Sequence, residues 1–255
     1  MLLPRIKDQN EKPLEAPVPN GGGFAAIFRT VACVGDSLAS GEFQVPDGNG
    51  GYSYHDVFPY SWGQFLGRLT GAKVYNFSRG GMTAQNYYTS FAESMGYWNP
   101  ELRAQAYIVA LGVYDIFNCH QTVGTVSDYE NGNKETFAYY YAAILHRLKE
   151  ISPYAHFFLV TTPKETAGEG IYNQPEAQKQ LRDLIADFAA SFDRAHLLDL
   201  YTYAPAVDRE FRANYYMEGH LNPAGYCLYG GIFASYIDYL VRQDPAAFND
   251  IGLHL

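Results

Sequence analysis

The distribution of apolar residues along the chain predicts five buried strands. Five short runs are apolar at nearly every position, which is typical of strands covered on both faces and differs from the alternation of a half-exposed strand. Because such strands occur mostly in parallel sheets flanked by helices, we expect one mostly parallel sheet. The runs cover residues 30–35, 73–77, 106–111, 156–161 and 196–200.

Between these runs, apolar residues recur every three or four positions, as they do along one face of a helix. In the last such segment, Asn222 and Pro223 are typical of a helix N-cap and first helical residue. Strand and helix alternate along the whole chain, so we predict a single α/β domain over residues 25–255, preceded by an extended lead-in over 1–24. The helical spacing is clear in 135–151, 177–188 and 222–240, and weaker in 61–69 and 83–94.

Two long segments interrupt the alternation of strands and helices. Residues 42–60 and 112–134 lack a sustained apolar period, and each follows the predicted carboxyl end of a strand. Irregular loops of this length in a compact domain are usually functional or mobile. We therefore expect both segments to be loops near the site.

Composition excludes several classes of partner. The formal net charge is -9 and no lysine or arginine cluster offsets it, so binding to nucleic acid or to an anionic membrane is not expected. No apolar run approaches the ~18 residues of a membrane span. The first residues lack a signal-peptide pattern, which predicts a cytoplasmic protein, although a truncated chain would look the same. Histidines and cysteines show no metal-ligand spacing, so neither a metal nor a cofactor is expected.

Chemistry-bearing residues follow the predicted strands at their carboxyl ends, where ligands bind in open parallel sheets. The first strand leads to Ser37, the second to Gly80 and Gly81, and His220 lies just before the last predicted helix. A serine becomes a nucleophile when a base such as imidazole takes its proton. Glycine lets main-chain N–H groups approach a developing oxyanion. Asp36-Ser37 alone would be ordinary turn chemistry, but the three features together predict an acyl-transfer site.

The same residues carry a resemblance to a known family. The sequence GDSL at 35–38, Gly81 within NFSRGGMT and His220 within GHLNPAGY resemble the SGNH, or GDSL-type, esterase and acylhydrolase superfamily. This resemblance implies a flavodoxin-like three-layer α/β/α sandwich with a five-stranded sheet. It also implies ester hydrolysis through an acyl-serine, with Ser37 as nucleophile, Gly81 as an oxyanion donor and His220 as general base.

Two positions depart from the family pattern. Tyr114 stands where the family usually has an oxyanion-hole asparagine, and Met217 stands where it has the aspartate of the triad. Tyr114 and the adjacent Asp115 are predicted to contact substrate. Either Glu218 or a backbone carbonyl is predicted to orient His220, since the third group of a triad mainly fixes the tautomer and stabilises the imidazolium.

The aromatic content favours a carbohydrate substrate. Rings with polar tips suit sugars, which offer an apolar face and rim hydroxyls. We expect hydrolysis of a short acyl ester, such as acetyl, on a small molecule or oligosaccharide. A lysophospholipase or thioesterase is the alternative enzyme, and a non-catalytic binding protein is the alternative class. The sequence does not indicate an oligomeric state. The two long segments carry Phe43, Tyr52, Tyr54, Phe58, Tyr60, Tyr114, Phe117 and Tyr129.

Overall fold

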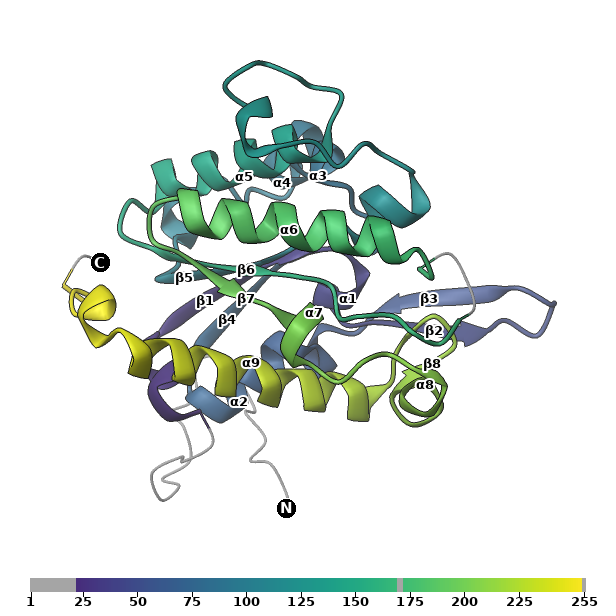
Figure 1. Ribbon diagram of the computed structural model, residues 1–255. Coiled ribbons are helices and arrows are strands. Elements are labelled where there is room, and N and C mark those ends of the chain that lie inside the picture. The colour runs from purple at the N-terminus through teal and green to yellow at the C-terminus, as the bar shows by residue number, and fades with distance from the viewer. Residues whose placement is uncertain (1–21, 169–171, 254–255) are drawn as a thin grey trace.

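A five-stranded parallel sheet forms the centre of the molecule. The computed structural model describes residues 22–168 and 172–253, so most of the predicted lead-in over 1–24 lies outside the described residues. The strands run in the order β4-β1-β5-β6-β7, which is the order of flavodoxin-like sheets (Figure 1). They are β1 (Thr30–Gly35), β4 (Lys73–Ser78), β5 (Ala106–Ala110), β6 (His156–Val160) and β7 (Ala195–Leu198).

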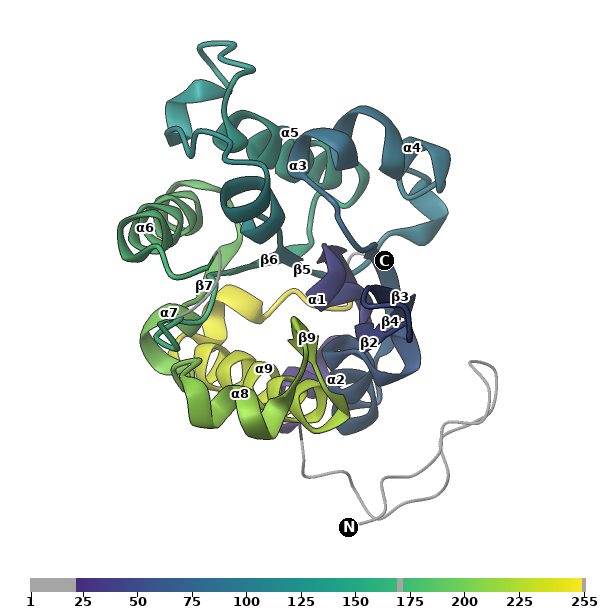
Figure 2. The same ribbon diagram turned by 90° about the vertical axis from the view of Figure 1, so that its right-hand side faces the viewer.

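Helices cover both faces of the sheet, so the predicted three-layer sandwich is confirmed (Figures 1 and 2). One face packs against α2 (Trp62–Thr70) and α9 (Pro223–Gln243), and the other against α5 (Phe137–Ile151) and α6 (Pro175–Ser191). Each face of the sheet has its own apolar cluster, because strands that are apolar at every position place apolar side chains on both faces. None of the helices formed by the described residues has the length and apolarity needed to cross a membrane.

Short elements connect these layers. The predicted weak helix over 83–94 is one continuous helical segment with a π-helical turn in its middle. The short helical elements are η1 (Gly23–Ile27), α1 (Ser37–Ser40), η2 (Phe58–Tyr60), α3 (Ala84–Asn86), η3 (Tyr87–Phe91), α4 (Ala92–Ser94), η4 (Pro100–Leu102), η5 (Tyr114–Asn118), η6 (Val126–Asp128), α7 (Leu200–Tyr203), α8 (Arg209–Tyr215) and η7 (Pro245–Phe248).

The last predicted strand, over 196–200, is too long at its carboxyl end. Strand β7 stops at Leu198, because Asp199 caps the following helix α7 by accepting a hydrogen bond from the main-chain N–H of Thr202 at 3.2 Å. Its buried carboxylate also accepts hydrogen bonds from Arg182 and Thr161. A capping side chain therefore overrides the apolar pattern at this strand end.

The first segment predicted as an irregular loop is instead a β-hairpin. Strands β2 (Glu42–Pro46) and β3 (Tyr52–Asp56) pair antiparallel, outside the central sheet. The two strands alternate in side-chain character around the turn residues 47–51, whose Asp-Gly and Asn-Gly steps are a strong hairpin signal. The second segment, 112–134, holds only the short helical turns η5 and η6, which agrees better with the prediction of a loop.

Candidate active site

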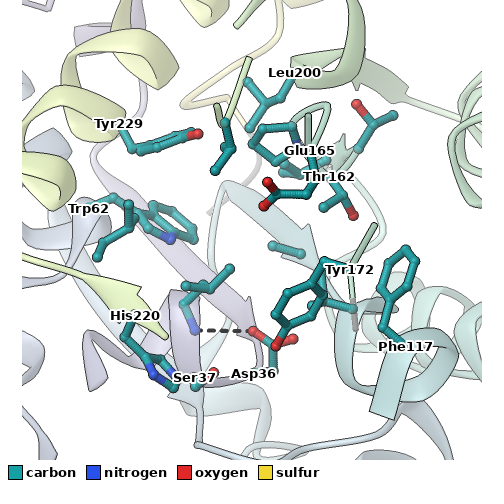
Figure 3. A pocket seen from close by; sticks show the side chains of 18 of the residues that line it. Asp36, Ser37, Trp62, Phe117, Thr162, Glu165, Tyr172, Leu200, His220 and Tyr229 are labelled. Carbon is teal, nitrogen blue, oxygen red and sulfur yellow. Dashed lines mark hydrogen bonds between the residues drawn. The ribbon is translucent and has the colours of Figure 1, made fainter. Parts of the chain in front are cut away.

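The predicted nucleophile and base lie together at the carboxyl edge of the sheet. Ser37 and His220 line one cavity of about 100 Å³, which continues past them toward Leu200 and Tyr229. Figure 3 shows the two side chains next to each other at one end of this cavity. The apolar wall opposite the sheet comes from Trp62 of α2 and from α9. The structure thus brings Ser37 and His220, from distant parts of the sequence, to one cavity.

Ser37 is held at the sharp turn from β1 into α1. The side chain of Asp36 caps this helix by accepting a hydrogen bond from the main-chain N–H of Leu38 at 3.1 Å. Gly35 is required just before it, because a Cβ there would lie 2.8 Å from the carbonyl oxygen of Ala110. The close packing of β1 against β5 thus places the serine at the edge of the cavity.

Gly81 and Tyr114 lie next to each other. Gly81 has φ of +68°, a left-handed conformation that glycine adopts without strain. A Cβ on Gly81 would lie 4.0 Å from the hydroxyl oxygen of Tyr114, so that hydroxyl is close to the main chain of Gly81. Among the described residues, the N–H groups of Ser37 and Gly81 donate no hydrogen bond to another part of the protein. Both remain available to an oxyanion.

His220 is held by the hairpin rather than by its own loop. Its Nδ1 lies 3.1 Å from Oε1 of Gln44, and its Nε2 lies 3.1 Å from Oε1 of Glu42. The ring also packs edge-on against Tyr54, with the ring centroids 6.0 Å apart. In the described part of the chain, no hydrogen bond joins His220 to Ser37. The imidazole is therefore at the site but turned toward the hairpin.

The structure corrects the predicted partner of His220. Glu218 is exposed, and its carboxylate accepts a hydrogen bond from the Tyr52 hydroxyl at 3.3 Å. It lies in the turn between β8 (Tyr216–Met217) and β9 (His220–Leu221), with φ of +56°. Met217, at the usual aspartate position, pairs with His220 across the same turn. No backbone carbonyl of the described residues accepts from the imidazole either.

Asp115 lies behind the site and not on its surface, which corrects its predicted contact with substrate. It is 0% exposed, and its Oδ1 accepts a hydrogen bond from the main-chain N–H of Ala84 at 2.8 Å. Its Oδ2 has no partner among the described residues. Burial raises the pKa of Asp115 to about 7 and that of Asp36 to about 6. Asp115 therefore ties the turn after β5 to the start of α3.

Glu42 and Gln44 are the site residues that the sequence analysis missed. Both belong to β2, and because successive side chains of a strand alternate between faces, residues two apart point the same way. The hairpin signal at residues 47–51 could have placed them on a strand. It could not have shown that the strand faces a histidine more than 170 positions later in the chain.

Known structures share the fold at low sequence identity. A protein from Lactobacillus plantarum matches with a TM-score of 0.62 and 18% identity, over 85% of this chain and 98% of that one. The lipase/acylhydrolase from Enterococcus faecalis matches with a TM-score of 0.57 and 17% identity, over 83% and 96%. A carbohydrate esterase family 2 enzyme with a carbohydrate-binding domain, from Corynascus (Myceliophthora fergusii), matches with a TM-score of 0.59 and 16% identity, over 89% and 68%.

Sequence comparisons give the family. No curated protein matches the chain. The model of the GDSL-like lipase/acylhydrolase family, however, matches residues 33–228, a span that runs from β1 into α9 and contains Ser37, Gly81 and His220. This span is most of the chain, and the parallel sheet has the strand order of this fold. The chain therefore belongs to the GDSL-like lipase/acylhydrolase family.

Proposed function

We propose that the protein is a serine ester hydrolase that works through an acyl-Ser37 intermediate. The Ser37 hydroxyl attacks the ester carbonyl, and His220 takes its proton and passes it to the leaving alcohol. The N–H groups of Ser37 and Gly81 then stabilise the oxyanion, with the Tyr114 hydroxyl beside them. The observation that carries this proposal is the shared cavity: Ser37 and His220 line it together.

The size of the cavity favours a short acyl group. An apolar cavity of about 150 Å³ holds a molecule the size of benzene, and the cavity beside Ser37 measures about 100 Å³. An acyl group of a few carbons fits this space. The lining by Trp62, Leu200 and Phe233 is apolar, which suits the hydrocarbon part of the acyl group.

The hairpin favours a carbohydrate as the alcohol part of the ester. Tyr52 and Tyr54 of the hairpin and Tyr60 of η2 are exposed, and Tyr54 contacts the His220 ring, so aromatic surface adjoins the base. Flat rings with hydroxyl tips suit the apolar faces and rim hydroxyls of sugars. The carbohydrate esterase among the structural neighbours adds support at the level of the fold. We therefore propose an acetyl or similarly short ester on a carbohydrate as the substrate.

Pre-steady-state kinetics test the covalent step. Mixing the protein with excess p-nitrophenyl acetate is expected to release about one equivalent of p-nitrophenol in a burst, because acylation precedes hydrolysis of the acyl-enzyme. Mass spectrometry of the quenched reaction should find one added acetyl group on the peptide that contains Ser37. Esters from acetyl to palmitoyl then test the acyl class. A maximum at long chains would favour a lipid acylhydrolase, and the absence of turnover would favour a binding protein.

Filling the cavity should narrow the range of acyl groups. Ala110 lines the cavity at the end of β5, opposite Gly35 of β1. In the variant Ala110→Leu, hydrolysis of the hexanoyl ester is expected to fall at least 10-fold, while acetyl hydrolysis changes little, because one excluded methylene costs about 10–200-fold in discrimination. The control Ala110→Ser adds little volume and should keep the wild-type profile. An unchanged ratio of hexanoyl to acetyl hydrolysis in Ala110→Leu would place the acyl group elsewhere.

A further inference from the structure

Two residues of β2 flank the imidazole of His220. In the family pattern, the partner of this histidine is instead an aspartate three residues before it. We propose that Gln44 and Glu42 divide the work of that aspartate: Gln44 fixes the tautomer of His220, and Glu42 supplies the negative charge that stabilises its protonated form. Both are positioning residues, since they act through His220. This inference rests on the proposed function. It names the residues that take the place of the third member of the triad.

The amide of Gln44 has one defined orientation. Its Oε1 accepts a hydrogen bond from the main-chain N–H of Gly219 at 2.9 Å. The opposite orientation would point the amide NH₂ at that N–H, and two donors cannot pair. The same Oε1 lies 3.1 Å from Nδ1 of His220, so Nδ1 must be the protonated nitrogen. In the neutral ring, the other nitrogen, Nε2, then carries no proton, as a general base requires.

Glu42 faces the other nitrogen of the ring. Its Oε1 lies 3.1 Å from Nε2, and its side chain is only 12% exposed. An unprotonated Nε2 and a carboxylate would repel each other, so this contact is favourable only when a proton lies between them. Once Nε2 of His220 has taken the proton of Ser37, the charge of Glu42 stabilises the imidazolium from the Nε2 side. A triad aspartate does so from the other side of the ring, by accepting from Nδ1–H.

Glycine residues next to Gln44 and Glu42 leave room for their side chains. A Cβ on Gly219 would collide with Oε1 of Gln44, and a Cβ on Gly80 would collide with the carboxylate of Glu42. The hydroxyl of Tyr226 also donates to the main-chain carbonyl of Glu42 at 2.8 Å, which fastens β2 to the helix that follows His220. The strand and the histidine are therefore fixed relative to one another.

Few other charges act on the imidazole. Asp36, from the turn after β1, interacts electrostatically with His220 but belongs to the cap of α1. Tyr54 presents its ring edge-on, and Glu218 of the neighbouring turn is bonded to Tyr52. Among the described residues, Glu42 is thus the carboxylate that contacts a ring nitrogen of His220.

Three variants test the inference. Gln44→Leu removes the acceptor for Nδ1, and kcat for p-nitrophenyl acetate is expected to fall at least about 10²-fold with little change in KM, because the base is held in the wrong tautomer. Gln44→Glu keeps an acceptor for both His220 and Gly219, so it should restore kcat to within about 10-fold of wild type. Glu42→Gln removes the charge alone and should lower kcat about 10-fold with the tautomer unchanged.

Nitrogen NMR of ¹⁵N-histidine-labelled protein gives the decisive readout. The His220 ring should be protonated at Nδ1 in the wild type and in Gln44→Glu, and should change tautomer in Gln44→Leu. Wild-type kcat and tautomer in a folded Gln44→Leu variant would overturn the inference. If Ser37→Ala retains activity, the proposed function fails. If Ser37→Ala is inactive while Gln44→Leu is fully active, only the inference about Gln44 and Glu42 fails.

Discussion

Replacing Ser37 with alanine is expected to lower kcat for p-nitrophenyl acetate by about 10⁴-fold or more. The change removes the attacking oxygen, and the residual rate would come from the oxyanion donors and binding alone. The substitution deletes one hydroxyl at the edge of the cavity, so the fold should be kept. Steady-state kinetics, together with the loss of the p-nitrophenol burst, measure the effect.

A matched control separates this effect from nonspecific loss. Ser90 is an exposed serine in the helical segment after β4, and its hydroxyl donates to the carbonyl of Asn86 at 3.0 Å. Ser90→Ala should therefore leave kcat and the burst unchanged. Equal turnover by wild type and Ser37→Ala would reject serine catalysis and favour a non-catalytic protein that binds ligands in the same cavity.

The largest expected effect on stability concerns the carboxyl of Asp115. Its pKa is raised by burial from 3.8 to about 7. A group whose pKa is higher in the folded state stabilises the fold at low pH, and this stability is lost as the pH rises through the folded pKa. The loss should therefore occur between about pH 4 and pH 7. Three pKa units correspond to roughly 4 kcal/mol, as an order of magnitude.

The variant Asp115→Asn cannot ionise, so it should not suffer this loss. Relative to wild type, its free energy of unfolding is expected to increase between pH 5 and pH 8, by up to a few kcal/mol. Urea unfolding at several pH values gives this difference directly, and the contribution of Asp36 is common to both proteins. Asp187→Asn, at an exposed position of α6, is the control and should track wild type. Parallel curves for Asp115→Asn and wild type would show that Asp115 does not titrate in this range.

The sequence predicted the central sheet well because its strands are buried on both faces. An unbroken apolar run leaves little choice of structure, and each of the five predicted runs became a strand of the parallel sheet. The capping carboxylate of Asp199 ended the last strand early, since one local hydrogen bond outweighs the apolar pattern there. The hairpin was missed because its strands are only five residues long and mostly exposed or half-exposed, so they form no buried apolar run. Its signal was the turn at residues 47–51.

The candidate site could be predicted only as far as local motifs reach. Ser37 and Gly81 sit in short blocks that follow strand ends, and His220 precedes a well-marked helix start, so strand order brings them to one edge. The surroundings of His220 depend on contacts between distant segments. Gln44 lies 176 positions before His220, and a contact over that separation cannot be predicted from spacing in the sequence.

The proposed mechanism needs Ser37 and His220 in place together before an ester can be cleaved. During synthesis, Ser37 leaves the ribosome long before His220 and the last helix do. An unfinished chain should therefore not hydrolyse esters. Refolding should show the same order of events. The indole of Trp62 packs at a tilt against Phe233 of that helix, with ring centroids 4.5 Å apart, so its fluorescence reports when the helix docks. Hydrolysis should return with this signal and never ahead of it.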